Sequence, residues 1–285
     1  MGKLAVKLLV KPLATVCASA CLLLTLSACT QDKDIDIESA THSSEHTLRI
    51  AAAANLSDVL PSIIDAYQAD NHLTESDIDV TYSSSGKLYA QIIAGAPYDI
   101  FLSANQEFPA KLAKEKEGSH LNNITHPPFS YAQGQLALYS VTKLLSELNI
   151  ESLADVFTND ANAKITIANP ELAPYGASAK AYLQSQKIYD KLNAEKRLIQ
   201  SENIGQAFQY AHTGSVDYGF VAQSQLIAIK AKPEQFMTLK PDTYPAILQD
   251  GIVISDSDMA VDFTDYLRST AGQQHFLQAG YLSIE

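Results

Sequence analysis

The sequence predicts an α/β fold in which mostly parallel sheets are flanked by helices and a ligand cleft lies between two lobes. Short apolar segments alternate with amphipathic ones along residues 48–285, which is typical of repeated strand–helix units. Right-handed crossovers place the carboxyl ends of the strands beside the N-termini of the following helices. Such turns occur both before and after the middle of the chain, as a cleft between two lobes requires.

The first half of this region contains three predicted strand–helix units. β-branched and aromatic residues indicate the strands, and apolar residues at helical spacing indicate the helices. Pro61 interrupts the first helical pattern, so we expect that helix to start late or to kink. The predicted strands are residues 48–52, 78–82 and 99–102, and the predicted helices are residues 56–67, 85–94 and 105–115.

The second half repeats the alternation and ends in two helices. Asn203 is a predicted N-cap, and Gly280 is expected to end the last helix. The predicted strands are residues 135–141, 165–168 and 218–221, and a short strand ends at Ile199. The predicted helices are residues 176–186, 259–269 and 271–279, and one more starts after Asn203.

Four strand-to-helix turns carry the candidate binding residues. A helix N-terminus has unpaired backbone N–H groups and a positive dipole end, and a serine hydroxyl or an amide adds further donors for a small anion. Taken singly, each residue reads as an ordinary cap or core residue, but their recurrence predicts an anion site. The four turns are Ala54-Asn55, Ser83-Ser84-Ser85, Tyr175-Gly176 and Asn203-Ile204.

Residues 1–29 are predicted to be an export signal. They contain three lysines followed by an apolar stretch too short for a comfortable membrane span. The stretch ends in Leu-Ser-Ala-Cys, which resembles a bacterial lipobox and implies that Cys29 becomes the lipidated first residue. The alternative is an ordinary signal peptide cut near Ala28. Residues 30–47 are polar, which predicts a flexible tether.

The cysteine and charge content excludes several classes of function. All three cysteines lie within residues 1–29, so the mature domain has no disulfide, thiol nucleophile or cysteine metal site. The formal net charge is −12, and because residues 1–29 hold three lysines and no acidic residue, the rest of the chain carries −15. This charge disfavours nucleic acid as a partner and repels anions at long range. An anion site must therefore use short-range neutral donors.

Two catalytic motifs occur without their usual companions. Residues 42–46, His-Ser-Ser-Glu-His, match a zinc-peptidase pattern but lie in the polar tether. Ser84 and Lys87 match the S-x-x-K motif of penicillin-recognising acylases, whereas the S-D-N and K-T-G elements are absent. The sequence therefore assigns no catalytic residue and no resident metal site, and a serine hydrolase stays a less favoured alternative.

Four segments, in matching order, resemble the extracytoplasmic molybdate-binding proteins that deliver substrate to ABC transporters. The combination Ser-Ser-Ser with Gly-Ala-Pro-x-Asp-x-Phe is the most specific part of this resemblance. The segments are residues 52–56, residues 83–88 with 95–104, residues 169–176, and residues 202–204 with 219–222.

The resemblance implies a two-lobed type II periplasmic-binding-protein fold. The chain would cross between the lobes near Tyr131 and Tyr244, which gives lobe 1 as residues 48–131 plus 245–285 and lobe 2 as residues 132–244. The implied oxyanion ligands, matched by position, are Asn55, Ser84, Tyr175 and Ile204, with Ala54 and Ser83 as neighbours.

Two positions depart from the pattern of this family. Many members have serine where Asn55 stands, and many have a ligand-contacting tyrosine where Ala222 stands. The phenol of Tyr175 is a candidate replacement for that missing hydroxyl.

The resulting expectation is a non-enzymatic binding protein for molybdate, and also tungstate, that serves an ABC importer. Molybdenum would be present only as the bound oxyanion, with no cofactor. The protein would be an extracytoplasmic monomer, periplasmic or on the cell surface, held at the membrane by its lipid and partnered with a permease. A binding protein for another small anion, such as sulfate, is the alternative, although it would need an arginine clamp that these segments lack.

Overall fold

The computed structural model describes residues 47–115, 126–146 and 153–284. Contacts divide the chain into Met1–Ser43 and Ser44–Glu285, and every described residue belongs to the second unit. The predicted signal, its Cys29 and the predicted tether up to residue 46 lie outside the described residues.

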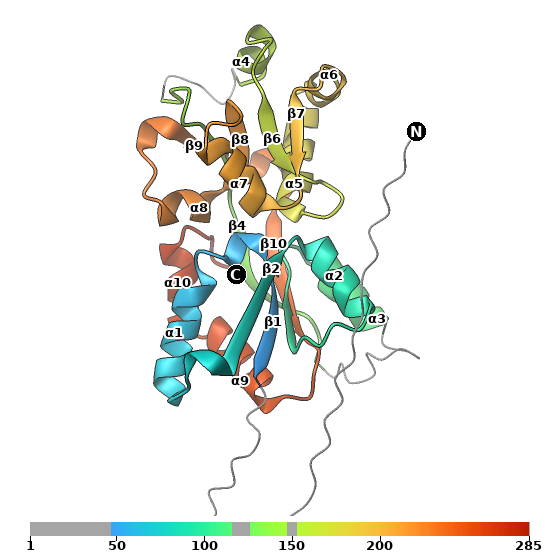
Figure 1. Ribbon diagram of the computed structural model, residues 1–285, viewed down its shortest axis with the longest axis vertical. Coiled ribbons are helices and arrows are strands. Elements are labelled where there is room, and N and C mark those ends of the chain that lie inside the picture. Colours follow the sequence, from blue (N-terminus) through green and yellow to red (C-terminus); the bar gives the residue numbers. More distant parts are fainter. Residues whose placement is uncertain (1–46, 116–125, 147–152, 285) are drawn as a thin grey trace, which may run out of the picture. The chain divides into compact units, whose positions relative to one another are not determined.

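Ten strands form two five-stranded sheets within the described residues. The first sheet has the strand order β2-β1-β3-β10-β4, and the second has the order β7-β6-β8-β5-β9 (Figure 1). The strands are β1 Leu48–Ala53, β2 Ile78–Ser83, β3 Ile100–Leu102, β4 Phe129–Gly134, β5 Leu136–Tyr139, β6 Ile165–Ala168, β7 Leu198–Ser201, β8 Tyr218–Ala222, β9 Phe236–Thr238 and β10 Ile247–Val253.

Helices cover both sheets. The α-helices are α1 Leu60–Asn71, α2 Ser85–Ile93, α3 Glu107–Lys114, α4 Leu153–Asn159, α5 Pro174–Ser185, α6 Tyr189–Ala194, α7 Ile204–His212, α8 Gln223–Ala228, α9 Asp258–Arg268 and α10 Thr270–Gln278. Short 3-10 turns are η1 Ala54–Leu56, η2 Glu75–Asp77, η4 Pro233–Gln235 and η5 Pro241–Thr243. Pro61 occupies the first turn of α1, which confirms the predicted late start. Within the described residues, none of these helices has the length and apolar character that a membrane span requires.

Alternation along the central strands gives each sheet two apolar faces. Ile50 and Ala52 of β1 belong to a core with α1, α9 and α10, whereas Ala51 belongs to a core with α2 and α3. Successive strand residues point to opposite faces, so a strand covered on both sides is apolar throughout. In the second sheet, α4 and α5 pack in one core and residues of α7 and α8 pack in the other.

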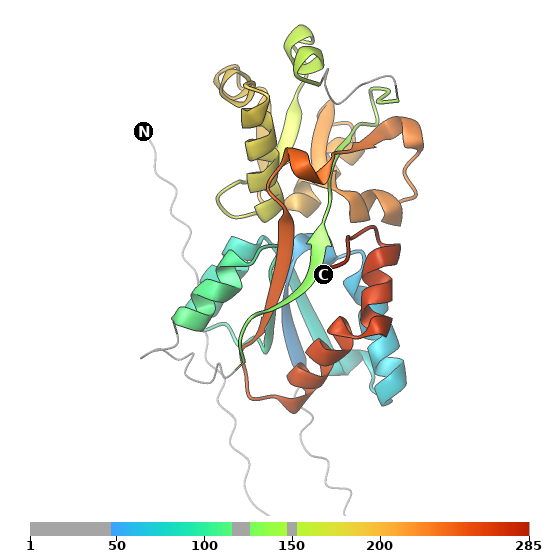
Figure 2. The same cartoon turned by 180° about the vertical axis from the view of Figure 1, so that it is seen from behind.

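The predicted two-lobed α/β fold is confirmed, but the sheets are mixed rather than mostly parallel. In each sheet the first two strand pairs are parallel and the last two are antiparallel. The antiparallel strands arise because the chain passes from one sheet to the other and returns. Strand β4 ends at Gly134 in the first sheet and β5 begins at Leu136 in the second (Figure 2).

The return path runs from β9 through η5 to β10, which pairs with β4. Tyr131, beside the predicted first crossing, lies inside β4, and Tyr244, beside the predicted second crossing, lies between η5 and β10. The paired strands β4 and β10 therefore carry the chain toward and away from the second sheet next to one another.

Candidate functional site

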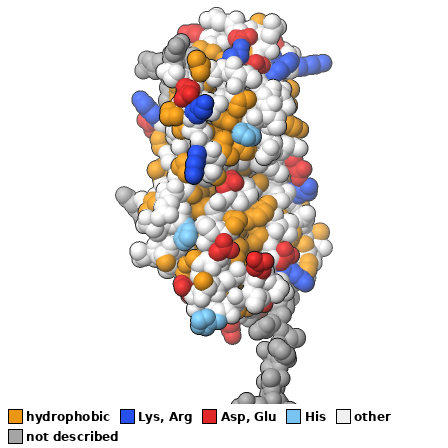
Figure 3. Space-filling model, turned by 60° about the vertical axis from the view of Figure 1, so that its left-hand side comes forward, with side chains coloured by type: hydrophobic (Ala, Val, Ile, Leu, Met, Phe, Trp, Pro, Cys, Tyr) orange, Lys and Arg blue, Asp and Glu red, His pale blue; other side chains and the backbone are white. Residues whose placement is uncertain are grey.

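A small cavity lies where the strand-to-helix turns of the two sheets meet. About 10 Å³ of it is open to the centre of a water-sized sphere, so it can hold at least one water molecule. None of the described residues that line it has a charged side chain, whereas acidic and basic side chains are scattered over the outer surface, as Figure 3 shows for one face. The lining residues are Ala53, Ala54, Asn55, Ser83, Ser84, Ser85, Ala104, Ala173, Pro174, Tyr175, Asn203 and Ile204.

The six site residues predicted from the sequence all line this cavity. They are Ala54, Asn55, Ser83, Ser84, Tyr175 and Ile204. The first four lie at or just after the ends of β1 and β2 of the first sheet, and the other two lie in the first turns of α5 and α7 beside the second sheet. Residues separated by up to 150 positions thus meet because parallel strands end at the same edge of a sheet.

The first sheet contributes hydroxyl groups to the cavity. Ser84 is the N-cap of α2 and is 3% exposed, yet its hydroxyl caps no backbone N–H. Within the described residues, Ser84 Oγ is one of the buried polar atoms that lack a hydrogen-bond partner. Ser85 Oγ, in contrast, accepts a hydrogen bond from Ala104 N at 3.0 Å and is used structurally. A buried hydroxyl without a partner is costly, so Ser84 is available for a ligand.

The second sheet contributes helix N-termini. Helix α5 begins at Pro174, and Gly176 lets its first turn pack directly on β6, because a Cβ there would lie 2.1 Å from Ala168 O. The Asn203 side chain accepts from Gln206 N at 3.0 Å, so the predicted N-cap of α7 is confirmed. Tyr175 and Ile204 lie in the first turns, where backbone N–H groups have no intrahelical partner. Each therefore offers a backbone donor under the positive end of a helix dipole.

The Asn55 amide is held by the residues behind the cavity. Asn55 Nδ2 donates to Gln249 Oε1 at 3.0 Å and to the Tyr281 hydroxyl at 2.9 Å. The Tyr281 hydroxyl donates in turn to Asn55 O at 2.8 Å. Among the described residues, Asn55 Oδ1 has no hydrogen-bond partner although Asn55 is fully buried. In this arrangement the amide turns its hydrogens away from the cavity, whereas the sequence led us to expect a donor.

The Tyr175 hydroxyl lies against the crossing strands. It accepts from Gln249 Nε2 at 3.3 Å, and a Cβ on Gly134 would lie 2.1 Å from it. Ala222, which the sequence marked as lacking a hydroxyl, is buried before α8 and is not among the described residues that line the cavity. Replacement of that hydroxyl by the Tyr175 phenol stays a prediction.

Three buried tyrosines contact Asn55 or Gln249 and stay protonated. Burial raises the pKa of Tyr131 and of Tyr175 well above the usual range. Burial also raises the pKa of Tyr281, against weaker lowering by hydrogen bonds from Ser224 and Asn55. Each phenol therefore supplies one hydroxyl proton, and no negative charge, to the region behind the cavity.

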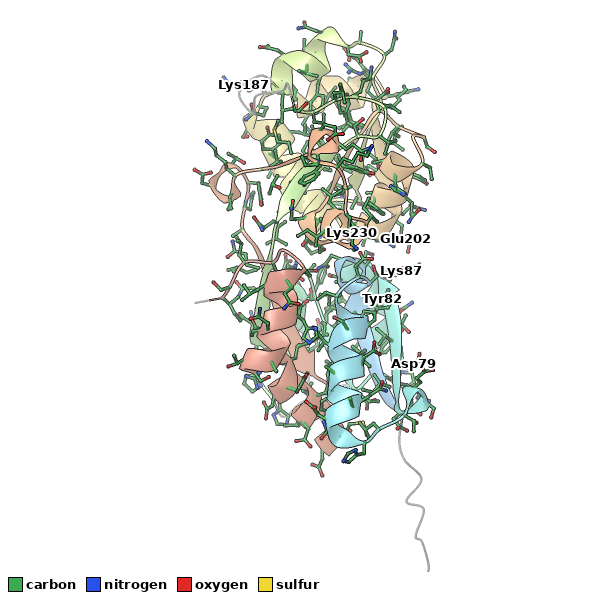
Figure 4. All side chains as sticks on the ribbon, turned by 90° about the vertical axis from the view of Figure 1, so that its left-hand side faces the viewer. Asp79, Tyr82, Lys87, Lys187, Glu202 and Lys230 are labelled. Atoms are coloured by element: carbon green, nitrogen blue, oxygen red, sulfur yellow. The ribbon has the colours of Figure 1, made fainter. Side chains whose placement is uncertain are left out.

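Two contacts join the lobes close to the residues that line the cavity. Lys87 Nζ, in the first turn of α2, pairs with Glu202 Oε1, just before α7, at 2.5 Å (Figure 4). Gly86 N donates to Leu172 O at 2.9 Å across the same boundary. These contacts join residues of the first sheet's helices to loops of the second, so they form only when the lobes are together.

The site lacks the parts of a serine hydrolase. Lys87 is paired with Glu202, and Ser84 Oγ has no partner among the described residues, so no base is placed to take the hydroxyl proton. The described residues also contain no group of three His, Cys, Asp or Glu side chains that could hold a metal ion. The zinc-like motif at residues 42–46 lies outside the described residues.

Two lobes that enclose an uncharged, donor-lined cavity define the class of two-lobed solute-binding proteins. The chain belongs to the bacterial extracellular solute-binding protein family, which matches residues 48–282. Its members bind solutes for ABC importers outside the cytoplasm and are not enzymes. The predicted resemblance to molybdate-binding proteins is also confirmed, by the following relatives.

Two curated relatives are named molybdate-binding protein ModA. The one from Azotobacter vinelandii is 29% identical over 238 residues, which cover 82% of this chain and 89% of the relative. The one from Rhodobacter capsulatus is 30% identical over 213 residues, which cover 74% of this chain and 79% of the relative. A putative ABC transporter substrate-binding lipoprotein, YvgL of Bacillus subtilis, is 30% identical and covers 82% of this chain and 86% of its own length.

Solved structures match the fold as well. The Azotobacter vinelandii periplasmic molybdate-binding protein superposes with a TM-score of 0.74 at 27% identity, covering 84% of this chain and 100% of that structure. The sulfate-binding protein SubI of Mycobacterium tuberculosis superposes with a TM-score of 0.64 at 14% identity, covering 84% of this chain and 88% of that structure. The second likeness concerns the fold alone.

Sequence reasoning missed the residues that hold the site from behind. Gln249, Tyr131 and Tyr281 lie on β10, on β4 and after α10, and none belongs to a recognisable local motif. Gln249 stands in Gln-Asp-Gly, which hides the apolar pattern of β10. The tyrosines in these segments are a sequence signal, but they indicate a role at the site only once it is known which strands are neighbours.

Proposed function

We propose that the protein captures molybdate, and also tungstate, and delivers it to an ABC importer. The observation that carries this proposal is the buried Ser84 hydroxyl beside the first turns of α5 and α7, which has no hydrogen-bond partner and no charged cavity-lining side chain beside it among the residues that the structure describes. Such a set of neutral donors suits a fully deprotonated oxyanion. The relatives named for molybdate binding support the choice of this anion.

The proposed mechanism is closure of the two lobes around the dehydrated anion. Hydrogen bonds to a charged acceptor are stronger than neutral ones, and bulk salt screens such short contacts little. Asn55, Ser84, Tyr175 and Ile204 are buried, so the lobes must move apart to admit the anion. The contacts between Gly86 and Leu172 and between Lys87 and Glu202 are the ones that such movement would adjust.

Selectivity would follow from size and from protonation. Sulfate is smaller than molybdate, so it could not reach all donors and would leave some buried groups unpaired. Phosphate keeps a proton near neutral pH and needs an acceptor. No carboxylate lines the cavity within the described residues, which disfavours phosphate.

A thermal-shift series with molybdate, tungstate, sulfate and phosphate tests the proposal. A ligand at a thousandfold excess over its Kd should add about 4 kcal/mol to the free energy of unfolding. At roughly 2–4 °C per kcal/mol for a domain of this size, the melting temperature should rise by several degrees. We expect the rise with molybdate and tungstate only. A rise with sulfate or phosphate instead would overturn the ligand, and no rise at all would overturn the function.

We further propose that the mature protein is a monomer that is lipidated at Cys29 and needs no cofactor. The Leu-Ser-Ala-Cys segment carries the lipid proposal, and the lipoprotein name of the Bacillus relative supports it. Replacing Cys29 by alanine should release the protein from the membrane fraction of expressing cells. Retention of the Cys29→Ala protein in that fraction would contradict the anchor.

A further inference from the structure

Gln249 connects both lobes to the Asn55 amide. It is fully buried on β10, where its Oε1 receives hydrogen bonds from Asn55 Nδ2 and from the Tyr131 hydroxyl, both at 3.0 Å. Its Nε2 donates to the Tyr175 hydroxyl at 3.3 Å. Tyr131 belongs to the first sheet and Tyr175 to a helix of the second, so one side chain bridges the two lobes behind the cavity.

The described arrangement leaves hydrogen-bonding groups unused. Asn55 Oδ1 has no donor among the described residues. The Tyr175 hydroxyl accepts from Gln249, and no described residue accepts its own proton. Gln249 Nε2 likewise spends one of its two hydrogens on Tyr175. Unused groups at a fully buried position are costly.

Turning both amides by 180° pairs these groups without moving any other heavy atom. Gln249 Nε2 then donates to Asn55 Oδ1 and to the Tyr131 hydroxyl, whose own proton goes to Ser103 O at 2.8 Å. Gln249 Oε1 then accepts from the Tyr175 hydroxyl. Amide oxygen and nitrogen differ little in size, so the rotation costs little in packing. Asn55 Nδ2 becomes the atom that faces the cavity.

The remaining contacts of Asn55 also suit the rotated arrangement. The Tyr281 hydroxyl, 2.9 Å from the amide, can donate to Oδ1 instead of to Asn55 O. Ser224 Oγ lies 3.4 Å from Asn55 O and donates to it, so that carbonyl keeps a partner. The rotation therefore leaves only the two Nδ2 hydrogens free, and both belong to a residue that lines the cavity.

We propose that Gln249 is a positioning residue that sets which atom of Asn55 faces the ligand. In the rotated arrangement Gln249 Nε2 holds Asn55 Oδ1, and Asn55 Nδ2 faces a fully deprotonated oxyanion. This inference rests on the proposed function and deepens it. It makes the pair a selector of the protonation state of the ligand, because Nδ2 binds an oxygen without a proton, whereas Oδ1 would bind a protonated one.

Two substitutions at Gln249 test the proposal by calorimetry with molybdate and with phosphate. Gln249→Glu offers acceptors at both positions, which holds Asn55 Nδ2 away from the ligand. We expect its molybdate Kd to rise by at least about 100-fold and by a larger factor than its phosphate Kd, because the added charge repels both anions but only phosphate has a proton for Asn55 Oδ1. Gln249→Met removes the acceptor as well as the donor. We expect its molybdate Kd to rise by about tenfold and its phosphate Kd not to fall.

The outcomes separate this inference from the proposed function. If the wild-type chain binds no molybdate, both fail. If the wild-type chain binds molybdate and Gln249→Glu keeps its Kd within about threefold, only the inference fails. A purely structural role for Gln249 would lower the melting temperature and weaken every ligand equally, which would also overturn it.

A measurement on the wild-type chain avoids dependence on the folding of the variants. In ¹⁵N-labelled protein, the side-chain amide signal of Asn55 is assigned by its loss in Asn55→Ser. Molybdate should shift both of its proton signals and slow their exchange with water, and the Gln249 amide should shift with them. An Asn55 amide signal that molybdate leaves unchanged would overturn this role of Gln249.

Discussion

The two lobes share one strand plan but meet the cavity with different chemistry. In each sheet the second strand of the order, β1 or β6, pairs in parallel with both neighbours, and two antiparallel strands follow. The first lobe brings the side chains of Asn55 and Ser84, whereas the second brings the backbone of the first turns that hold Tyr175 and Ile204. The same strand-to-helix geometry can therefore display either side-chain or main-chain donors.

This difference has a consequence for mutation. On the first lobe, the identity of the side chain should decide binding. On the second lobe, the path of the backbone should decide it, and side chains matter only where they move that path. The four predictions below separate these two modes, from the largest expected effect to the smallest.

Gly176→Ala should have the largest effect, because it displaces backbone donors of the second lobe. The added Cβ would meet Ala168 O at 2.1 Å, and a main-chain atom in a sheet cannot yield easily. We expect a loss of about 1–3 kcal/mol in the free energy of unfolding and a molybdate Kd raised by at least about 100-fold. Urea unfolding and calorimetry measure the two effects.

Gly86→Ala is the matched control in the first lobe. Across the lobe boundary, its Cβ would meet Leu172 Cα at 3.0 Å and the Leu172 side chain at 3.1 Å. Within the first lobe it would meet the Phe108 side chain at 3.1 Å. Gly86→Ala should therefore oppose closure and weaken binding, and its loss in the free energy of unfolding should be smaller than that of Gly176→Ala. Equal stabilities for the two variants would contradict the backbone role of Gly176.

Ser84→Ala should weaken binding without weakening the fold. It removes a donor to a charged ligand, worth about 1.5–3 kcal/mol or roughly 10- to 150-fold in Kd. The melting temperature without ligand should stay the same or rise, because the lost hydroxyl is buried and unpartnered within the described residues. Ser85→Ala should instead lower the melting temperature and change Kd little, since Ser85 Oγ accepts a hydrogen bond from Ala104 N at 3.0 Å. A melting temperature lowered as much by Ser84→Ala as by Ser85→Ala would show that Ser84 is structural.

Lys87→Met should weaken binding slightly, because it removes a contact that only the closed lobes make. The Lys87 and Glu202 side chains are 49% and 43% exposed, so solvent limits the pair to about 0.2–1 kcal/mol, or roughly 1.5- to 5-fold in Kd. The effect should disappear in high salt. Lys111→Met breaks a pair within α3, with Glu107 at 2.6 Å, and should leave Kd unchanged. Equal losses for the two variants would show that the pair across the lobes has no role in closure.

Ile204→Val should leave the molybdate Kd within about twofold, because this residue offers its backbone N–H. Its side chain is 3% exposed and packs in the core of the second lobe, so the free energy of unfolding should fall by about 0.5–1.5 kcal/mol. A rise of tenfold or more in Kd would show that the side chain itself shapes the site.

The sequence predicted the strand–helix units well where local patterns are strong. Helix α2 after the serine triplet, the N-cap at Asn203 and the end of the last helix near Gly280 follow from short-range chemistry. Strands β4, β9 and β10 were missed, because polar residues or glycines interrupt two of them and the third has only three residues. The short helices α4, α6 and α8 carry too few turns to show a period.

By itself, the sequence determined the fold class and the turns that could hold an anion, because capping and dipole effects act within a few residues. Only the tertiary structure decided how the Asn55 amide and the Tyr175 hydroxyl are held. Gln249 lies 194 positions from Asn55 and 74 from Tyr175, and long-range strand pairing brings the three together. The direction of a buried hydrogen bond depends on such distant partners, and no local pattern contains them.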